Sequence, residues 1–181
     1  MTSETAEEVI AATRHWLETA VIGLDLCPFA RAVYSRNQVR YAVSQAEAPE
    51  ELLVDFLGEL DLLAEADPED VETTLLIHPG VLGDFLDYND FLGVAEAALA
   101  DRGLEGVLQV ASFHPRYQFA GTAPDAIENY TNRSPYPILH LLREESVAQA
   151  VAAVPDAAQI YEKNILTLRR LGHAGWKRLG I

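Results

Sequence analysis

The stretch that decides the fold reads TTLLIHPGVLGDFLDYNDFLGVAEAALADRGLEGVLQVASFHP and runs from Thr73 to Pro115. Its beginning, Thr73 to Ile77, and its end, Val107 to Phe113, are rich in aliphatic and β-branched residues and predict two strands. Between them, apolar residues recur at helical spacing from Phe85 to a glycine stop at Gly103. A strand, a helix and a strand in this order predict a crossover that joins two parallel strands.

The flanking sequence adds elements of the same kind. A capping box of Thr5 and Glu8 opens an N-terminal helix that ends near Gly23, a short strand covers Val39 to Val43, and Pro49 opens the next helix. On the C-terminal side we expect a fourth strand over Leu139 to Leu142 and two helices, near Ser146 to Val154 and Ile160 to Leu171.

The size of the chain is that of one domain. A length of 181 residues with 49% hydrophobic residues suits one well-buried core. We therefore predict a single domain over residues 1–181, of the α/β class: an α+β sandwich with a mixed sheet of about four strands, ferredoxin-like or related, and helices packed on it. The fourth strand is expected to run antiparallel, because a long loop precedes it.

The charge distribution narrows the range of partners. The net charge is −15, and the segment from Tyr41 to Asp101 holds 16 acidic residues and no Lys or Arg. Such a surface repels nucleic acid and anionic lipid. The sequence has no apolar run of about 18 residues and its N-terminus is acidic, which argues against membrane spanning and secretion. Its single cysteine, Cys27, excludes an internal disulfide, and together these features predict a cytoplasmic protein.

Three histidines, His78, His114 and His140, lie at or near the ends of predicted strands. His78 and His114 should share the carboxyl edge of the sheet, where α/β proteins bind ligands, whereas His140 lies deeper. Our first hypothesis is a metal-dependent enzyme in which these three residues hold a transition metal such as iron or zinc, with Cys27 as an alternative ligand. Their spacing matches no compact ligand motif, so hydrogen-bonded structural histidines are the alternative.

The loop from Pro115 to Tyr136 is the second candidate region, because connections of this length are usually functional or disordered. Its aromatic residues favour a packed loop. It contains Asn129, Asn132 and Arg133, and the Arg133 guanidinium suits a carboxylate or a phosphate because its fork can bind two oxygens. An ion pair of Arg133 with one of the many surface acids is an equally simple interpretation.

These residues support a second hypothesis, a metal-free acid/base or thiol enzyme. His114 would transfer protons, Arg133 would bind the anionic group, and Asn129 or Asn132 would donate to developing negative charge. Cys27 would be the nucleophile, although its apolar neighbours also fit a buried structural thiol. A third hypothesis is a domain that binds a metabolite or a protein partner without catalysis.

Three strings carry a resemblance to a known family: LDLCPFA at 24–30, VASFHP at 110–115 followed by YQFAG at 117–121, and NYTNRSPYP at 129–137. They resemble a bacterial family known only as a domain of unknown function, family 1415, over nearly the whole chain. The resemblance implies a stand-alone bacterial domain and no particular reaction.

Of the three hypotheses, we favour a small-molecule enzyme acting on an anionic substrate, a carboxylate or a phosphate. The reason is that the polar groups gather where an α/β fold places its pocket. The terminal helices leave open whether they pack on their own sheet or on a second subunit of a homo-oligomer.

Overall fold

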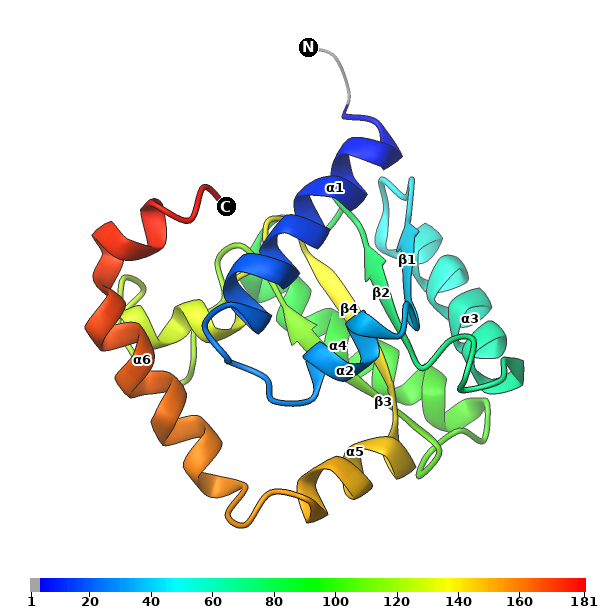
Figure 1. Cartoon of the computed structure of the whole chain (residues 1–181). Helices are drawn as coiled ribbons and strands as arrows, with labels where there is room; N and C mark the ends of the chain where they lie inside the picture. Colours follow the sequence, from blue (N-terminus) through cyan, green and yellow to red (C-terminus); the bar gives the residue numbers. More distant parts are fainter. Residues whose placement is uncertain (1–3) are drawn as a thin grey trace.

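A computed structural model describes residues 4–181 and shows one four-stranded sheet with helices on both faces (Figure 1). The spatial order of the strands is β1-β2-β4-β3. The strands are β1 (Val39–Val43), β2 (Thr73–Ile77), β3 (Leu108–Phe113) and β4 (Ile138–Arg143). The α/β prediction with a mixed sheet of four strands is therefore confirmed.

Strand direction follows from the crossovers. β1 pairs with β2 in parallel, and β4 runs antiparallel to both β2 and β3. Strands β1, β2 and β3 therefore point the same way, and β4 lies between β2 and β3. This arrangement of β2, β3 and β4 is a split βαβ unit, which ferredoxin-like folds also contain. Consequently the carboxyl ends of β2 and β3, followed by His78 and His114, lie at one edge of the sheet.

One face of the sheet is fully covered. Helices α3 (Pro49–Glu65) and α4 (Phe85–Asp101) pack on it and form the larger core. Leu76, Leu139 and Leu141 project into this core from β2 and β4, each at most 1% exposed. Burying a leucine side chain completely contributes roughly 1.5–3 kcal/mol, so this face supplies much of the stability.

The opposite face is covered only in part. Helix α1 (Ala6–Trp16) continues without a break into a π-helix, η1 (Leu17–Ile22), and the two lie over the carboxyl half of β1–β3. There Trp16 packs edge-on against Phe113, with ring centroids 5.2 Å apart. The predicted N-terminal capping box is present, since the Thr5 and Glu8 side chains each accept from the other's backbone N–H. The sequence did not predict the π-helix.

The remaining elements lie around the sheet rather than on it. They are α2 (Ala30–Ser35), a 3₁₀-helix η2 (Ile127–Asn132) in the long loop, α5 (Glu144–Ala152) and α6 (Ala158–Lys177). In Figure 1, α5 and α6 form an arc beside the sheet, and the main contact of α6 is with η2. Helix α6 extends beyond the predicted end at Leu171 and is interrupted at Gly172, where φ is +68°. Within residues 4–181, no helix combines the length and the apolar character that crossing a membrane requires.

Candidate functional site

His78 and His114 meet at the carboxyl edge of the sheet, on either side of Tyr88. Tyr88 is a fully buried residue of α4, and the centroids of its ring and the rings of His78 and His114 lie 5.9 and 4.9 Å apart. The Tyr88 hydroxyl donates to the Ile138 carbonyl at 2.7 Å and accepts from the Phe113 N–H at 3.1 Å. The two histidines that the sequence places at one edge are therefore close neighbours.

The ring nitrogens of His114 are both engaged by the backbone. Its Nδ1 accepts from the Arg116 N–H at 3.0 Å, which leaves Nε2 to carry the proton and donate to the Leu82 carbonyl at 2.9 Å. His114 is fully buried, and burial lowers its pKa. A neutral imidazole with two occupied nitrogens holds the loop between β2 and α4 and has neither a lone pair nor a proton left for a ligand.

His78 performs a similar task from β2. Its Nδ1 lies 3.0 Å from the Val81 carbonyl, so Nδ1 is the protonated nitrogen and donates to this oxygen. Burial lowers the pKa of His78 to about 4. Its Nε2 is buried and has no partner within residues 4–181. Together the two histidines hold the carbonyls of Val81 and of Leu82, whose φ is +60°.

His140 does not join this pair. It lies in the middle of β4 opposite Leu75 and Ala111, so its side chain projects from the partly covered face, whereas Tyr88 and its two histidines belong to the other side. In the described part of the chain, no three His, Cys, Asp or Glu residues are grouped as metal ligands. The structure therefore does not bring the three predicted metal ligands together. Side chains alternate between the two faces along a strand, and His140 falls on the face opposite to His78 and His114.

The two asparagines of the long loop also serve the backbone. Asn129 is fully buried, where it accepts from the Phe119 N–H at 2.9 Å and donates to the Ala123 carbonyl at 2.9 Å. Asn132 donates to the Ser112 carbonyl of β3 at 2.9 Å. The loop is thus compact, as its aromatic content predicts, and these two amide groups hold it together rather than face a ligand.

Arg133 lines a cavity at the carboxyl edge of the sheet, which we call the arginine cavity. Its volume is about 400 Å³, and it is lined by Asp84, Phe85, Leu86, Arg116, Gln118, Pro124 and Arg133. The Arg133 guanidinium donates through Nε to the Tyr117 carbonyl at 3.1 Å and through Nη2 to the Pro124 carbonyl at 2.5 Å. None of the ion pairs found among residues 4–181 involves Arg133 or Arg116.

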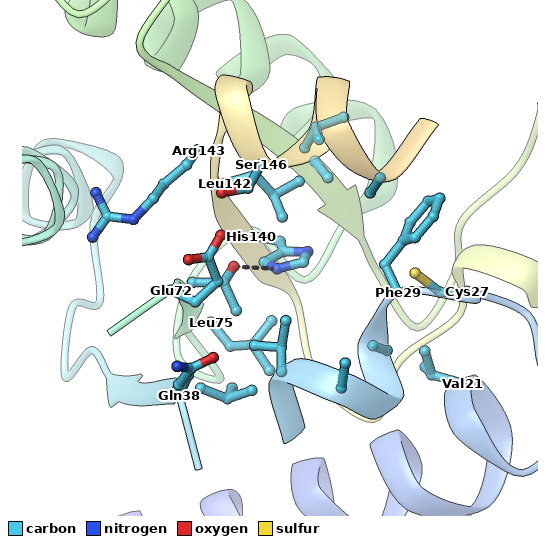
Figure 2. A pocket seen from close by; sticks show the side chains of 18 of the residues that line it. Val21, Cys27, Phe29, Gln38, Glu72, Leu75, His140, Leu142, Arg143 and Ser146 are labelled. Carbon is cyan, nitrogen blue, oxygen red and sulfur yellow. Dashed lines mark hydrogen bonds between the residues drawn. The ribbon is translucent and has the colours of Figure 1, made fainter. Parts of the chain in front are cut away.

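A larger cavity, which we call the sheet cavity, lies on the partly covered face, between η1 and α2 on one side and α5 on the other. This sheet cavity has a volume of about 890 Å³ (Figure 2). Its floor is the end of the sheet that α1 and η1 do not reach, where β2, β3 and β4 carry small or polar residues. They are Thr73, Gln109, Ala111 and His140, and Leu142 adds an apolar side chain beside them.

Thr73 fixes the protonation of His140 at the floor of the sheet cavity. The Thr73 hydroxyl lies 2.6 Å from the Leu141 carbonyl and 2.7 Å from His140 Nε2. A hydroxyl has one proton, and the carbonyl can only accept it, so Nε2 must be the donor in the second bond. His140 Nδ1 is therefore unprotonated, and no hydrogen bond to it is found within residues 4–181. In Figure 2 the dashed line ends at the other ring nitrogen of His140, and Nδ1 lies on the side of the ring away from it.

The electrostatics keep His140 neutral. Burial lowers its pKa to about 4, so the ring is uncharged at neutral pH. The Arg143 guanidinium, at the end of the same strand, donates through Nη2 to the Ala66 and Val71 carbonyls at 3.1 and 2.7 Å. Figure 2 shows it directed away from His140. The floor of the cavity therefore offers an acceptor without a charge.

Cys27 lines the sheet cavity together with Phe29 and Val21 (Figure 2). Cys27 is half-buried and packs against the core on this face of the sheet. It belongs to the cavity on the partly covered face, whereas His114 lies at the carboxyl edge beside Tyr88, so the structure does not pair Cys27 with His114. The π-helix immediately precedes this segment, and such helices often occur at functional sites.

Sequence reasoning missed the sheet cavity and the role of Thr73. The available signal is the alternation within β3, where the aliphatic residues Leu108 and Val110 alternate with Gln109 and Ala111. A buried β-strand that is aliphatic on one face and polar or small on the other leaves the second face poorly packed.

Fold and cavities together define an α/β sandwich with one face of its sheet partly open. The chain belongs to the family described as "Protein of unknown function (DUF1415)", whose model matches residues 8–178. This confirms the family resemblance seen in the sequence. Neither a curated protein nor a solved structure matches the chain.

Proposed function

We propose that this protein binds a small, mostly apolar molecule in the sheet cavity and that His140 Nδ1 accepts a hydrogen bond from it. One observation carries the proposal: a half-covered sheet face presents a neutral imidazole whose proton is held on Nε2 by Thr73. An apolar hollow with a few fixed polar groups is the usual form of a small-molecule site.

Size and chemistry define the class of ligand. The volume of about 890 Å³ is within the range of roughly 300–1,000 Å³ that drug-sized ligands occupy. Val21, Phe29 and Leu142 supply apolar contacts from three sides of the cavity. Because the acceptor at the floor is uncharged, the matching group is an N–H or O–H donor rather than an anion.

Binding fits His140 better than acid/base catalysis does. A general base is most effective when its pKa is near the working pH, and burial lowers the pKa of His140 to about 4. Its Nδ1 is unprotonated at neutral pH but only weakly basic. A hydrogen bond to this atom would orient a ligand and select molecules with a donor at the right position.

The test uses N-phenyl-1-naphthylamine, an uncharged fluorescent probe with one N–H donor, and 1-phenylnaphthalene, which lacks the donor. We expect saturable binding of both to the parent protein, measured by fluorescence enhancement. Ala111→Trp fills the floor and should weaken both at least tenfold. His140→Phe removes the acceptor and should weaken only the amine, by about five- to tenfold, the usual contribution of one hydrogen bond.

The control is Ala148→Trp, which adds the same side chain to an exposed position of α5 outside the cavity lining. It should leave the binding of both probes unchanged. Equal binding to the parent and to the Ala111→Trp variant would refute the sheet cavity as the binding site. Equal weakening of both probes by His140→Phe would refute the hydrogen bond.

A further inference from the structure

The arginine cavity lies apart from the sheet cavity and has a lining of its own. It brings Arg116 and Arg133 together at the carboxyl edge of the sheet, and neither forms an ion pair within residues 4–181. The whole chain has 28 acidic and only 13 basic residues. Acidic side chains are therefore abundant, yet none of them forms an ion pair with either of these two guanidinium groups within residues 4–181.

Arg133 is held in place before any ligand binds. Two loop carbonyls accept from its Nε and Nη2, and its guanidinium carbon lies 4.5 Å from the centre of the Tyr130 ring. These contacts use two of its five N–H donors and leave the others available. A fixed side chain loses little entropy on binding, which favours an anion site.

Arg116 completes the positive charge. Its side chain is exposed, and no hydrogen bond from its guanidinium is found in the described chain. The charges that line the cavity also act on buried His114. Burial is the main cause of its lowered pKa; the charges of Arg116 and Arg133 lower the pKa further, and the charge of Asp84 opposes them.

Asp84 limits the charge that the cavity can take. Its carboxylate caps α4, since Oδ1 accepts from the Leu86 and Asp87 N–H groups at 2.9 and 3.2 Å. Two arginines and one aspartate leave a single net positive charge. A monoanion such as a carboxylate balances this charge, whereas a phosphate dianion would be repelled by Asp84.

The cavity also has an apolar wall. Phe85 packs against Tyr117 with ring centroids 5.2 Å apart, and Leu86 beside it is 71% exposed. Covering this exposed leucine with an apolar group of a ligand would remove apolar surface from water and so favour binding.

We propose that the arginine cavity binds a small carboxylate with a short apolar body, whose carboxylate meets Arg116 and Arg133 and whose body lies on Phe85 and Leu86. This site is distinct from the sheet cavity and does not depend on the function proposed for it. The proposed ligand is an anion, as the sequence predicts, but it is recognised by two arginines rather than by an arginine together with a histidine.

The experiment titrates the parent protein with sodium butyrate, sodium acetate and inorganic phosphate at constant ionic strength, following Arg side-chain N–H signals by NMR. Butyrate should bind saturably and several-fold more tightly than acetate, because each buried methylene contributes up to about 0.8 kcal/mol. Phosphate should bind more weakly than butyrate. Arg116→Gln should weaken butyrate at least tenfold without changing the thermal midpoint, since its guanidinium holds nothing in the fold.

Two further variants make the outcome decisive. Arg170→Gln removes an equal charge from an exposed position on α6 and should leave butyrate binding within twofold of the parent. Asp84→Asn keeps a capping side chain and should tighten phosphate several-fold. Absence of saturable butyrate binding, or equal loss in the Arg116 and Arg170 variants, would overturn the site. Tighter binding of phosphate than of butyrate by the parent would overturn the carboxylate class.

Discussion

A histidine at the end of a strand can bind a metal, transfer a proton or hold a loop, and the partners of its two nitrogens distinguish these roles. In His114 the backbone occupies both nitrogens, and in His78 one nitrogen holds the Val81 carbonyl. In His140 a side chain occupies one nitrogen and leaves the other beside a cavity. Of these three histidines, His140 is the one with a ring nitrogen that lines the sheet cavity and accepts no hydrogen bond from residues 4–181.

The first prediction concerns His114. We expect His114→Ala to lower the free energy of unfolding by about 2–4 kcal/mol, because it removes a buried ring and leaves the Leu82 carbonyl without its donor. Urea denaturation at neutral pH measures this. His173→Ala is the control: its exposed ring donates to the Asp125 carbonyl and touches the Tyr130 ring edge-on, so we expect a loss below about 1 kcal/mol. A similar loss in both variants would refute the loop-holding role.

The second prediction concerns pH. His78 and His140 have pKa values lowered from 6.5 to about 4 in the folded protein. Between these values the unfolded chain binds protons that the folded chain does not, so stability falls as the pH is lowered. The slope for each residue is at most about 1.4 kcal/mol per pH unit. Above pH 6.5 both forms are neutral and neither residue contributes.

The comparison of the parent with His140→Phe isolates this effect from the titration of the carboxylates. Urea denaturation from pH 7 down to pH 4.5 should give a shallower fall for the variant, because His78 and His114, whose pKa values burial also lowers, remain while the contribution of His140 is gone. Parallel curves would show that His140 is protonated equally in the folded and unfolded chains.

At the scale of elements, α6 is held by loops rather than by the sheet. Asn164 on α6 donates to the Leu26 carbonyl at 2.8 Å, next to Cys27, and the Tyr130 ring of η2 packs against His173 and Trp176. The helix therefore joins the segment that lines the sheet cavity to the loop that supplies Arg133. The break at Gly172 lies within its contact with that loop.

The third prediction concerns this break. Gly172 has φ +68°, a conformation that costs an L-residue about 1 kcal/mol or more, and a Cβ there would meet no neighbour. We expect Gly172→Ala to destabilise the protein by about 1 kcal/mol. Gly58→Ala, at an exposed position in the middle of α3, should instead stabilise it by about 0.5–1 kcal/mol. Thermal denaturation of both variants checks the opposite signs, and a shift of the same sign in both would refute the argument.

At the scale of the whole molecule, the sheet was predictable because its central strands are rich in aliphatic and β-branched residues. Thr73 to Ile77 is buried along its entire length, and such a run bounded by Pro and Gly is a strong strand signal. The crossover rules then gave the parallel direction of β2 and β3 and their common edge. The short helix α2 and the π-helix escaped prediction, because tertiary packing rather than local propensity determines such segments.

The sheet cavity was less predictable, because it depends on the register of the strands and on the part of the sheet face that no helix covers. Which face His140 occupies follows from its pairing with Leu75 and Ala111, and a shift of one residue would reverse the face. The hollow above it exists because α1 and η1 stop short and α5 turns aside. These are properties of the assembled layers, and no motif in the chain encodes them.

The position of β4 has a consequence for synthesis of the chain. β4 follows β2 and β3 in the sequence and is therefore synthesised after both, yet it lies between them, and within residues 4–181 it is the strand with which β3 pairs. The parallel β1–β2 pair can form before β4 is synthesised. The backbone N–H and C=O groups of β3 that bond to β4 remain without these partners until residues 138–143 emerge. Nascent chains that end before Ile138 therefore expose an unpaired strand edge to neighbouring chains. The sheet can be completed only after β4 has been synthesised.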